Sequence, residues 1–534
     1  MIRFALPFAM LLATPVTAQS GPQAVSPERL SADVRALASD AFGGRAPGTP
    51  GETRTVEWLI AQLKAAGLQG GAKGGAWTQP VPLVRTQTGP GTLSAGGAAL
   101  AQGRDVYVST VRPVERVHIA DAPLVFVGHG VSAPERGWDD FKGVDLTGKV
   151  AVFLVNDPDF AAAAGEPVMG RFGGRRMTYY GRWTYKFEEA ARRGAAAALI
   201  VHDTEGAGYG WATVNAPAGE AYDVAKPPAA RVGLQGWIEG AAAARLFAAN
   251  GMDLAQLRVA ARRADFRPVE LRGRFSSDLP VTFTRATSAN VLAKLPGRTR
   301  PGEAVMFGAH WDAYGPGKPG ANDDALGVAG LLEIARAAAK GPRSARTLMF
   351  GFWTGEERGL LGSETYAADP VIPHARTVAN ITLDILNTGG PARDVMLVGG
   401  GQNGLEDLLR TAAAGQGRTI TPEALPERGL SYRADHFPMA RRGVPTLLLM
   451  AISGAPDLVR GGRARGQAWL DGYMRCYHQA CDAWSPALDF RSAAQDVELA
   501  RQVGMTLANG TAWPEWTDAS EFKAVRARTA AERR

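Results

Sequence analysis

The stretch E-A-V-M-F-G-A-H (303–310) begins the strand–helix–strand run that decides the fold of this chain. Its apolar residues predict a buried strand that ends at His310. The sequence then predicts a helix over D-A-L-G-V-A-G-L-L-E-I-A-R-A-A-A-K (324–340) and a second buried strand over R-T-L-M-F-G-F-W-T (346–354). Two apolar strands joined by a helix are typical of a parallel sheet that helices cover on both faces.

The same pattern continues on both sides of this run. Further strands are predicted over N-I-T-L-D-I-L (380–386), R-D-V-M-L-V (393–398) and V-P-T-L-L-L-M (444–450). Upstream, helices are predicted around residues 27–39 and 56–63. We therefore expect an α/β fold, with a mixed, mostly parallel sheet flanked by helices.

Residues 120–274 have a different texture, in which short apolar runs alternate with turns. This pattern predicts a self-contained, strand-rich second domain with a few helices. Its histidines, His118, His129 and His202, have no paired carboxylates beside them, so we expect ordinary core or surface residues. The charged segment after residue 515 predicts a peripheral helix or a loose tail.

Five side chains of the kinds that bind metal ions follow in a fixed order: His310, Asp323, Glu357, Asp384 and His478. Three of them fall at or just after the carboxyl end of a predicted strand, the edge where open α/β sheets bind ligands. Two histidines and three carboxylates are sufficient for a pair of divalent ions. We prefer this interpretation to scattered polar loop residues, because chance would not place them beside one strand after another.

Neighbouring residues indicate how the work is divided. Asp312 shares a strand face with His310, so its carboxylate can accept a hydrogen bond from the far nitrogen of that histidine. Asp323 lies in a turn before a helix, where two carboxylate oxygens can bridge two ions. In the pair Glu356-Glu357, one side chain can bind metal while the other faces the substrate as a proton carrier. Rival signatures are missing: the sequence has no G-x-S-x-G, no H-E-x-x-H and no G-x-x-x-x-G-K-[ST].

Residues 1–18 have the pattern of a secretory signal peptide. Arg3 supplies a positive charge, residues 4–15 an apolar run, and Ala18 a small residue before the cleavage site. An N-terminal membrane anchor is the alternative, and no other run is long and apolar enough to span a bilayer. We expect an exported protein, periplasmic or secreted, without a membrane span.

The two cysteines, Cys476 and Cys481, flank His478. They allow a thiolate zinc site of the C-x-H-x-x-C kind, or a disulfide that holds His478 in place. Export to an oxidising compartment favours the disulfide. A cysteine nucleophile would require one of them to be unpaired.

The charge of the chain argues against a nucleic-acid partner. Its 59 Lys and Arg against 52 Asp and Glu are scattered, and the one basic cluster, residues 460–465, lies in a glycine-rich loop.

Taken together, these residues resemble Peptidase family M28, whose members are co-catalytic zinc peptidases, mostly aminopeptidases with some carboxypeptidases. The resemblance rests on H-x-D (310–312), N-D-D-A-x-G (322–327), E-E-x-G-L-x-G-S (356–363), L-D (383–384) and Y-H-x-x-x-D (477–482). The segments F-G-G-R-x-P-G-T-x-G (42–51) and R-A-D-H-F-P-M-A-R-R-G-V-P (433–445) also look like the family. The middle segment resembles the protease-associated (PA) domain that some members carry as an insertion.

The resemblance implies a zinc exopeptidase-like fold and a role for each residue. One zinc ion would be held by His310 and Asp384, the other by Glu357 and His478, with Asp323 bridging both. Glu356 would be the general base, and Asp312 would support His310. The implied domains are a signal peptide (1–18), the N-terminal part of the peptidase domain (19–110), a PA-like insertion (111–275), the metallopeptidase domain (276–512) and a charged tail (513–534).

Several points stay open at this stage. The family often has serine where Ala434 precedes Asp435 and His436, which puts substrate contacts in question; His436 is either a substrate neighbour or a structural residue. Tyr473 and Tyr477 do not resolve which tyrosine stabilises an oxyanion. The substrate is expected to be a peptide or small protein.

Three other functions compete with an aminopeptidase: a carboxypeptidase of the same family, a transferase like the glutaminyl cyclases, and a silent, receptor-like binding protein. Glutaminyl cyclases use one zinc ion, and the receptor ectodomains of this architecture have lost their ligands. All five ligand residues are present here, which disfavours the last two.

Overall fold

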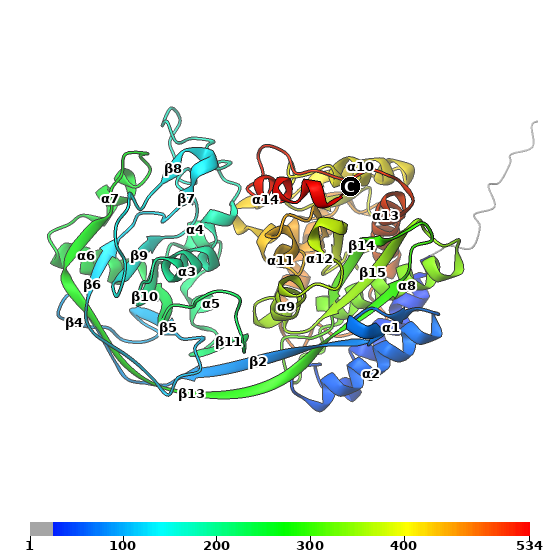
Figure 1. Ribbon diagram of the computed structural model, residues 1–534, viewed down its shortest axis with the longest axis horizontal. Coiled ribbons are helices and arrows are strands. Elements are labelled where there is room, and N and C mark those ends of the chain that lie inside the picture. The colour runs from blue at the N-terminus through cyan, green and yellow to red at the C-terminus, as the bar shows by residue number, and fades with distance from the viewer. Residues whose placement is uncertain (1–24, 534) are drawn as a thin grey trace, which may run out of the picture.

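Two lobes joined by a pair of long strands make up the protein (Figure 1). The computed structural model describes residues 25–533, so the expected signal peptide lies outside the described residues. The linking strands are β2 (Thr78–Thr88) and β13 (Val269–Leu295), which pair antiparallel. β13 is 27 residues long, so one end joins the sheet of the first lobe and the other the sheet of the second.

The first lobe contains the expected mixed, mostly parallel sheet, in the order β19-β16-β14-β15-β13. The parallel strands are β14 (Arg300–His310), β15 (Arg346–Trp353), β16 (Thr377–Leu383) and β19 (Thr446–Leu449). β13 pairs antiparallel with β15, and β2 and β1 (Gln69–Gly70) extend the sheet on that side. The predicted α/β class is therefore confirmed.

Both faces of this sheet are buried, as the unbroken apolar strands predict. Along β14, Val305 and Phe307 enter one core, whereas Met306 enters the core on the opposite face, because successive strand residues point to opposite sides. One face is covered by α1 (Pro27–Leu37), α2 (Pro50–Ala65), α8 (Leu326–Lys340) and α13 (Phe490–Asn509). The other face is covered by α9 (Leu361–Ala368) and α11 (Phe437–Ala440).

One predicted strand lies outside the main sheet. β17 (Asp394–Leu397) forms at the expected place but pairs only with β18 (Thr419–Pro422), in a separate two-stranded sheet. α10 (Leu405–Gly415) connects these two strands, and α12 (Gly462–Cys476) leads to His478.

The second lobe has its own sheet, in the order β13-β6-β9-β10-β12-β5. Its parallel strands are β6 (Arg116–Phe126), β9 (Val150–Leu154), β10 (Ala197–Val201) and β12 (Leu234–Ile238); β5 (Val106–Ser109) is antiparallel. Its longer helices are α3 (Trp183–Arg192) and α6 (Gly240–Ala249). The shorter elements are β3 (Thr92–Ala95), β4 (Ala98–Ala99), β7 (Ser132–Ala133), β8 (Trp138–Asp139), β11 (Glu220–Val224), α4 (Thr204–Ala207), α5 (Trp211–Asn215) and α7 (Leu254–Ala260).

The second lobe begins earlier than the boundary expected at residue 111. Leu93 of β3 and Val106 of β5 belong to the same apolar core as Phe126, so these strands are part of this lobe. The sequence pattern that would predict these strands was weak because glycine and alanine dominate residues 89–103.

The C-terminal segment is a packed helix and not a loose tail. α14 (Lys523–Arg528) is anchored by Phe522 and Arg526, which are buried, and Trp516 of the preceding segment is buried as well. Tyr179 of the second lobe packs against Phe437 and Phe522, so the two lobes touch beyond the linking strands.

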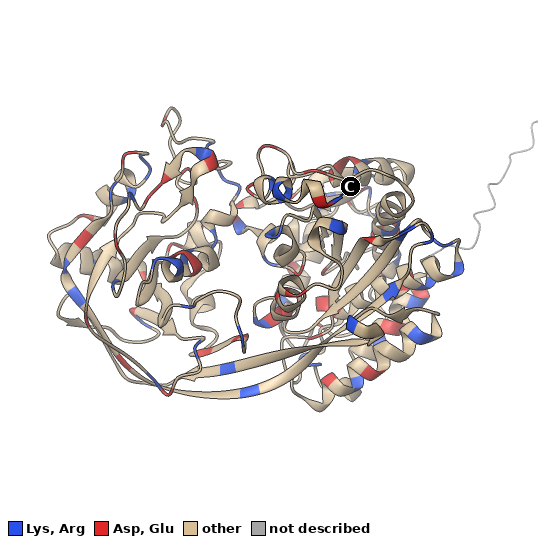
Figure 2. Cartoon of the chain, in the orientation of Figure 1, with Lys and Arg blue, Asp and Glu red and all other residues tan. Residues whose placement is uncertain are grey.

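Basic and acidic residues are interspersed over both lobes (Figure 2). Within residues 25–533, every helix is too short or too polar to cross a membrane.

Candidate metal centre

The five expected ligand residues meet at one edge of the first-lobe sheet. His310 ends β14, Asp384 follows β16 directly, and Glu357 lies in the short turn after β15. These strands are parallel, so their carboxyl ends reach the same edge and bring distant residues together. Asp323 comes from the turn before α8, and His478 from the loop after α12.

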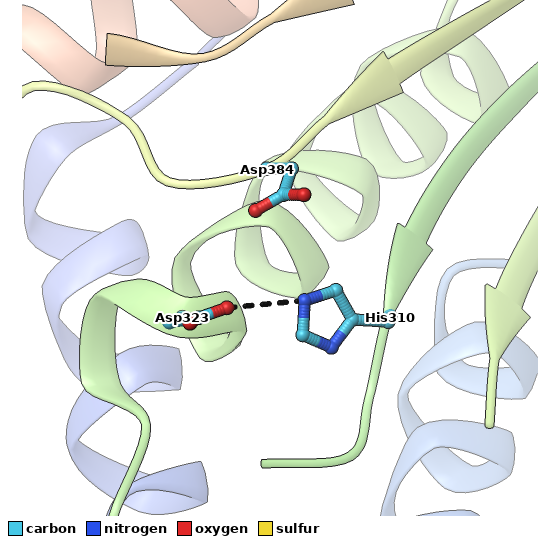
Figure 3. A group of neighbouring side chains, drawn as sticks. All are labelled: His310, Asp323 and Asp384. Atoms are coloured by element: carbon cyan, nitrogen blue, oxygen red, sulfur yellow. Dashed lines mark ion pairs between the residues drawn. The ribbon is translucent and has the colours of Figure 1, made fainter. Parts of the chain in front are cut away.

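Asp323 lies between the two histidines. Its Oδ1 is 3.2 Å from Nε2 of His310, and its Oδ2 is 3.2 Å from Nε2 of His478. Glu357 Oε2 lies 3.0 Å from the same nitrogen of His478. The ligand atoms therefore form two groups that share Asp323, one completed by Asp384 (Figure 3) and one by Glu357.

These groups fit a pair of divalent cations. Nε2 of His310, Oδ2 of Asp323 and Oε1 of Glu357 are buried and have no hydrogen-bond partner. Lone pairs that face one another in a buried site repel, and a cation between them removes that cost. Imidazole nitrogens and carboxylate oxygens are ligands that zinc accepts.

The electrostatics of the site are those of an acid cluster that needs positive charge. Burial raises the pKa of Asp384 to about 8, with Asp323 and Asp435 adding to the shift. Burial likewise raises the pKa of Glu356 well above its usual range, with Asp384 and Asp435 adding to it. Burial alone would lower the pKa of His478, but Asp323 and Glu357 raise it to about 9.

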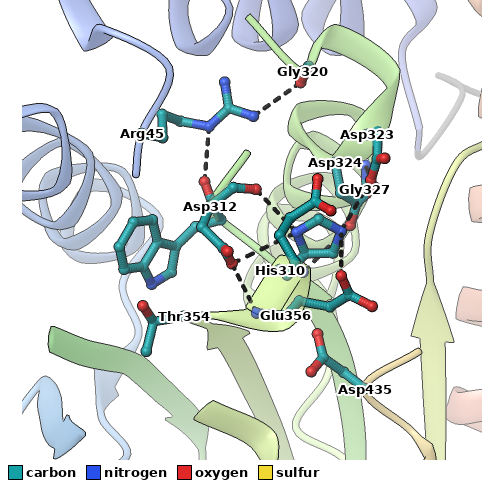
Figure 4. A network of polar contacts seen from close by, with 12 residues as sticks. Arg45, His310, Asp312, Gly320, Asp323, Asp324, Gly327, Thr354, Glu356 and Asp435 are labelled. Carbon is teal, nitrogen blue, oxygen red and sulfur yellow. Dashed lines mark hydrogen bonds and ion pairs between the residues drawn. The ribbon is translucent and has the colours of Figure 1, made fainter. Parts of the chain in front are cut away.

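Asp312 supports His310 in a way that differs from the expected one. Nδ1 of His310 lies 2.9 Å from the backbone carbonyl oxygen of Asp312, whereas the carboxylate Oδ1 is 3.7 Å away, too far for a hydrogen bond. That carboxylate instead accepts a hydrogen bond of 3.2 Å from the backbone nitrogen of Glu356 (Figure 4). The two-residue spacing placed Asp312 correctly but could not distinguish its backbone oxygen from its side chain.

Three further residues, Asp324, Arg45 and Asp482, hold the ligand loops in place. They lie in the sequence motifs quoted above, but the motifs did not show which groups they would contact. Asp324, fully buried, accepts hydrogen bonds from the backbone nitrogens of Gly327 (2.9 Å), His310 (3.3 Å) and Ile385 (3.4 Å). It thereby ties the end of β14 to the start of α8 and to the segment after β16.

Arg45 and Asp482 act on the loop that carries Asp323. The buried Arg45 guanidinium donates hydrogen bonds to the carbonyl oxygens of four residues: Leu37, Trp311, Pro319 and Gly320. The Asp482 carboxylate accepts hydrogen bonds from the backbone nitrogens of Asn322 and Asp323, at 3.0 and 3.1 Å.

His478 is fixed by its neighbours on both sides. Cys476 and Cys481 form a disulfide with a Cα–Cα distance of 5.1 Å, so neither thiolate is free to bind metal. The His478 ring is stacked between Tyr314 and Tyr477, with ring centroids 4.1 and 3.7 Å away.

His436 is not brought into the ligand groups. It is buried, its Nε2 lies 2.9 Å from the carbonyl oxygen of Ser431, and burial lowers its pKa to about 4. It lines a separate pocket with Ser431, Tyr432 and Trp516. Its neighbour Asp435 does reach the centre: its carboxylate lies beside that of Glu356 (Figure 4) and raises the pKa of that residue.

Comparisons with known proteins agree with this geometry. Residues 290–502 match the model of Peptidase family M28. Leupeptin-inactivating enzyme 1 of Streptomyces exfoliatus is 31% identical over 210 residues, which cover 38% of this chain and 45% of that protein. A probable lipoprotein aminopeptidase, LpqL, of Mycobacterium tuberculosis is 33% identical over 126 residues, 23% of this chain and 25% of that protein. The chain thus spans less than half the length of these curated relatives.

A solved aminopeptidase from Aneurinibacillus sp. strain AM-1 has the same fold, with a TM-score of 0.50 at 20% identity; the alignment covers 92% of this chain and 95% of that one. The matched segment contains all five expected ligand residues at the edge of a sheet of this fold. Residues 290–502 are therefore similar to Peptidase family M28, and the chain has the fold of this solved aminopeptidase.

Proposed function

We propose that this protein is a two-zinc exopeptidase of the aminopeptidase type, with Glu356 as the general base. The observation that carries the proposal is the position of Asp323, whose two oxygens face the two histidines of separate ligand groups. His310 and Asp384 would hold one ion, Glu357 and His478 the other, and Asp323 both.

When bound, the two cations supply the Lewis acidity that polarises a peptide carbonyl and lowers the pKa of an attacking water. Glu356 is free for the proton, because its carboxylate is not part of either ligand group and its Oε2 lies 3.9 Å from Nε2 of His310. Glu356 takes a proton from the water molecule while the oxygen atom of that water attacks the carbonyl carbon of the substrate. It then delivers that proton to the nitrogen of the leaving amine as the C–N bond breaks.

Asp312 and Asp435 set the conditions for this transfer. Asp312 accepts the backbone N–H of Glu356 and fixes the turn that carries the base. Asp435, next to the Glu356 carboxylate, favours the protonated form of that residue, so the proton can be held between the two steps. The positively charged α-amine of a substrate would be attracted to the carboxylates of the site. This attraction is our reason for proposing an aminopeptidase.

The place of action and the second lobe belong to the same proposal. We propose export to the periplasm or the medium, which the charge and apolar pattern of residues 1–18 supports, together with a disulfide of the kind found in oxidising compartments. We also propose that the second lobe is a domain of the PA type inserted in the peptidase, as the sequence resemblance implies.

The decisive experiment is Glu356→Gln, studied with the full chain by metal analysis and hydrolysis of aminoacyl-anilides. We expect about two zinc ions per chain and a loss of most hydrolysis, at least about 100-fold. Glu57→Gln, on the exposed side of α2, is the control for removing a glutamate and should retain full activity. Retained activity in Glu356→Gln would refute the assignment of the base.

The same preparation separates the competing functions. One zinc ion with cyclisation of N-terminal glutamine would indicate a transferase, and absence of metal binding would indicate a binding protein. Cleavage of peptides whose amino end is blocked, at the C-terminal residue, would indicate a carboxypeptidase.

A further inference from the structure

Three arginines meet at the junction of the two lobes without an acidic partner. Arg182 precedes α3 of the second lobe, and Arg428 and Arg433 lie in the first-lobe loop before α11. In the part of the chain that the structure describes, none of the three side chains makes a hydrogen bond or an ion pair. Glu427, the residue before Arg428, is already bound by Arg175 at 2.9 Å.

Close backbone approaches bring these side chains together. A Cβ atom at Gly429 would lie 3.2 Å from Cδ of Arg182, so the second-lobe arginine runs along the loop that carries the other two. At the same junction, Arg428 Cγ would lie 3.3 Å from a Cβ atom at Gly208 of the second lobe. The positive charge of Arg433 lowers the pKa of both Arg182 and Arg428, after burial as the first cause.

Arg182 is the residue that most requires an anion. It is 6% exposed, and its Nε is buried without a hydrogen-bond partner. The Trp183 ring lies 5.7 Å from its guanidinium carbon, and Tyr209, Tyr432 and Tyr179 partly offset the lowering of its pKa by burial. A buried cation without a counter-ion is costly, and proteins seldom keep one without a function.

The cluster borders the metal centre. Arg433 is two residues before Asp435, whose carboxylate lies beside that of Glu356 (Figure 4). The Tyr477 ring is stacked on His478, and the charge of Arg433 acts on Tyr477 by opposing the rise in its pKa that burial causes. A ligand bound to Arg433 would therefore lie within a short peptide's length of the metal ligands.

We propose that Arg182 and Arg433 form a carboxylate-binding subsite between the lobes, so that the preferred substrates are peptides with a free carboxylate close to the scissile bond. A guanidinium presents paired N–H donors that match the two oxygens of a carboxylate. The carboxylate is either the C-terminus of a short peptide or an Asp or Glu side chain. The subsite gives the second lobe a direct part in substrate selection, and it rests on the proposed peptidase function.

Binding to the zinc-loaded Glu356→Gln protein tests the subsite without turnover. Titration calorimetry would compare Leu-Ala, Leu-Ala amide and Leu-Glu amide. We expect the preferred acid to bind about 10- to 100-fold tighter than Leu-Ala amide. A preference for Leu-Ala identifies the C-terminal carboxylate as the ligand, and a preference for Leu-Glu amide identifies the side chain. Equal affinity for all three peptides would overturn the proposal.

Charge-removing variants then locate the effect. Arg433→Gln and Arg182→Gln should bring the ratio of acid to amide affinity close to one, and Arg433→Lys should restore part of it. Arg285→Gln removes an exposed arginine of β13 far along the linking strand and should keep the wild-type ratio. Arg433 is only half-buried, so we expect Arg433→Gln to fold. This variant still tests the proposal if Arg182→Gln does not fold.

Failure of the subsite and failure of the proposed function have different signatures. Wild-type protein that hydrolyses Leu-anilide, with an affinity ratio that Arg433→Gln leaves unchanged, would refute the subsite alone. Wild-type protein that binds acids selectively but cleaves neither anilides nor peptides would refute the peptidase function and leave the subsite standing.

Discussion

Asp482 holds Asp323 by its backbone: Oδ2 of Asp482 accepts a hydrogen bond of 3.1 Å from the Asp323 nitrogen. Asp323 is the residue shared by both ligand groups, so this contact fixes the middle of the metal centre. Asp482 follows His478 by four residues, and one loop therefore supplies both a ligand and the clamp for its partner.

Asp482→Asn should weaken metal binding without unfolding the protein. The amide nitrogen cannot accept a hydrogen bond, so one of the two clamped N–H groups loses its partner. We expect a 10- to 100-fold lower zinc affinity, as is usual when a group supporting a ligand is removed. Competition with a chelator of known affinity measures the change. Asp471→Asn, on the exposed side of α12, should behave as wild type; an unchanged Asp482→Asn would show that the clamp is dispensable.

Asp323→Ala should lose both ions, because it removes a ligand from each group, whereas Asp384→Ala removes a ligand from one. Metal content per chain after dialysis measures the difference. We expect the Asp323→Ala protein to retain almost no metal and the Asp384→Ala protein to retain more. Two tightly held ions in Asp323→Ala would contradict the bridging role.

Arg45→Met should destabilise the whole first lobe. The substitution leaves four carbonyl oxygens around the ligand loops without their donor, at a cost of about 3 kcal/mol or more in the free energy of unfolding. Urea unfolding measures this loss. Arg54→Met, on the exposed face of α2, is the matched control and should change stability by less than about 0.5 kcal/mol.

Reduction of the disulfide should affect one ligand group more than the other. The Cys476–Cys481 bond encloses His478, which belongs to the group with Glu357. The Cys476→Ser, Cys481→Ser double variant should keep its fold but hold fewer than two zinc ions at low free zinc. Equal retention of both ions would show that the stacking of Tyr314 and Tyr477 suffices to place the ring.

Metal removal should destabilise the protein more at alkaline than at acid pH. Without metal, the pKa of Asp384 is raised to about 8 and that of Asp435 to about 7, chiefly by burial. The folded state then binds more protons than the unfolded state, so its stability falls as pH rises from about 4 through 8. The raised pKa of His478, about 9, acts in the same direction.

Bound metal replaces those protons, and its affinity rises with pH. The difference in Tm between zinc-loaded and chelator-treated protein should therefore grow from pH 5.5 to pH 8.5. A constant difference over this range would show that the ligand carboxylates do not titrate in the metal-free protein.

Much of the centre could be predicted because its residues lie next to strands. The apolar runs 303–310, 346–354 and 380–386 marked strands, and the polar residues at their ends marked the sheet edge. His436 shows the limit of such reasoning. It stands in a family-like motif beside Asp435, yet its ring turns to the carbonyl oxygen of Ser431, and the neighbouring carboxylate reaches Glu356 instead.

The sequence by itself determined the α/β class and the order of the five candidate ligand residues, because buried strands and strand-end side chains leave a local pattern. Only the tertiary structure decided which atoms meet. The hydrogen bond from the Glu356 backbone to the Asp312 carboxylate, the clamp of Asp482 on Asp323 and the approach of Arg182 to the Arg433 loop all join residues whose pairing depends on chain packing. Hydrogen bonds and buried charges are set by distances of a few ångströms between distant segments, and no local pattern of residues records them.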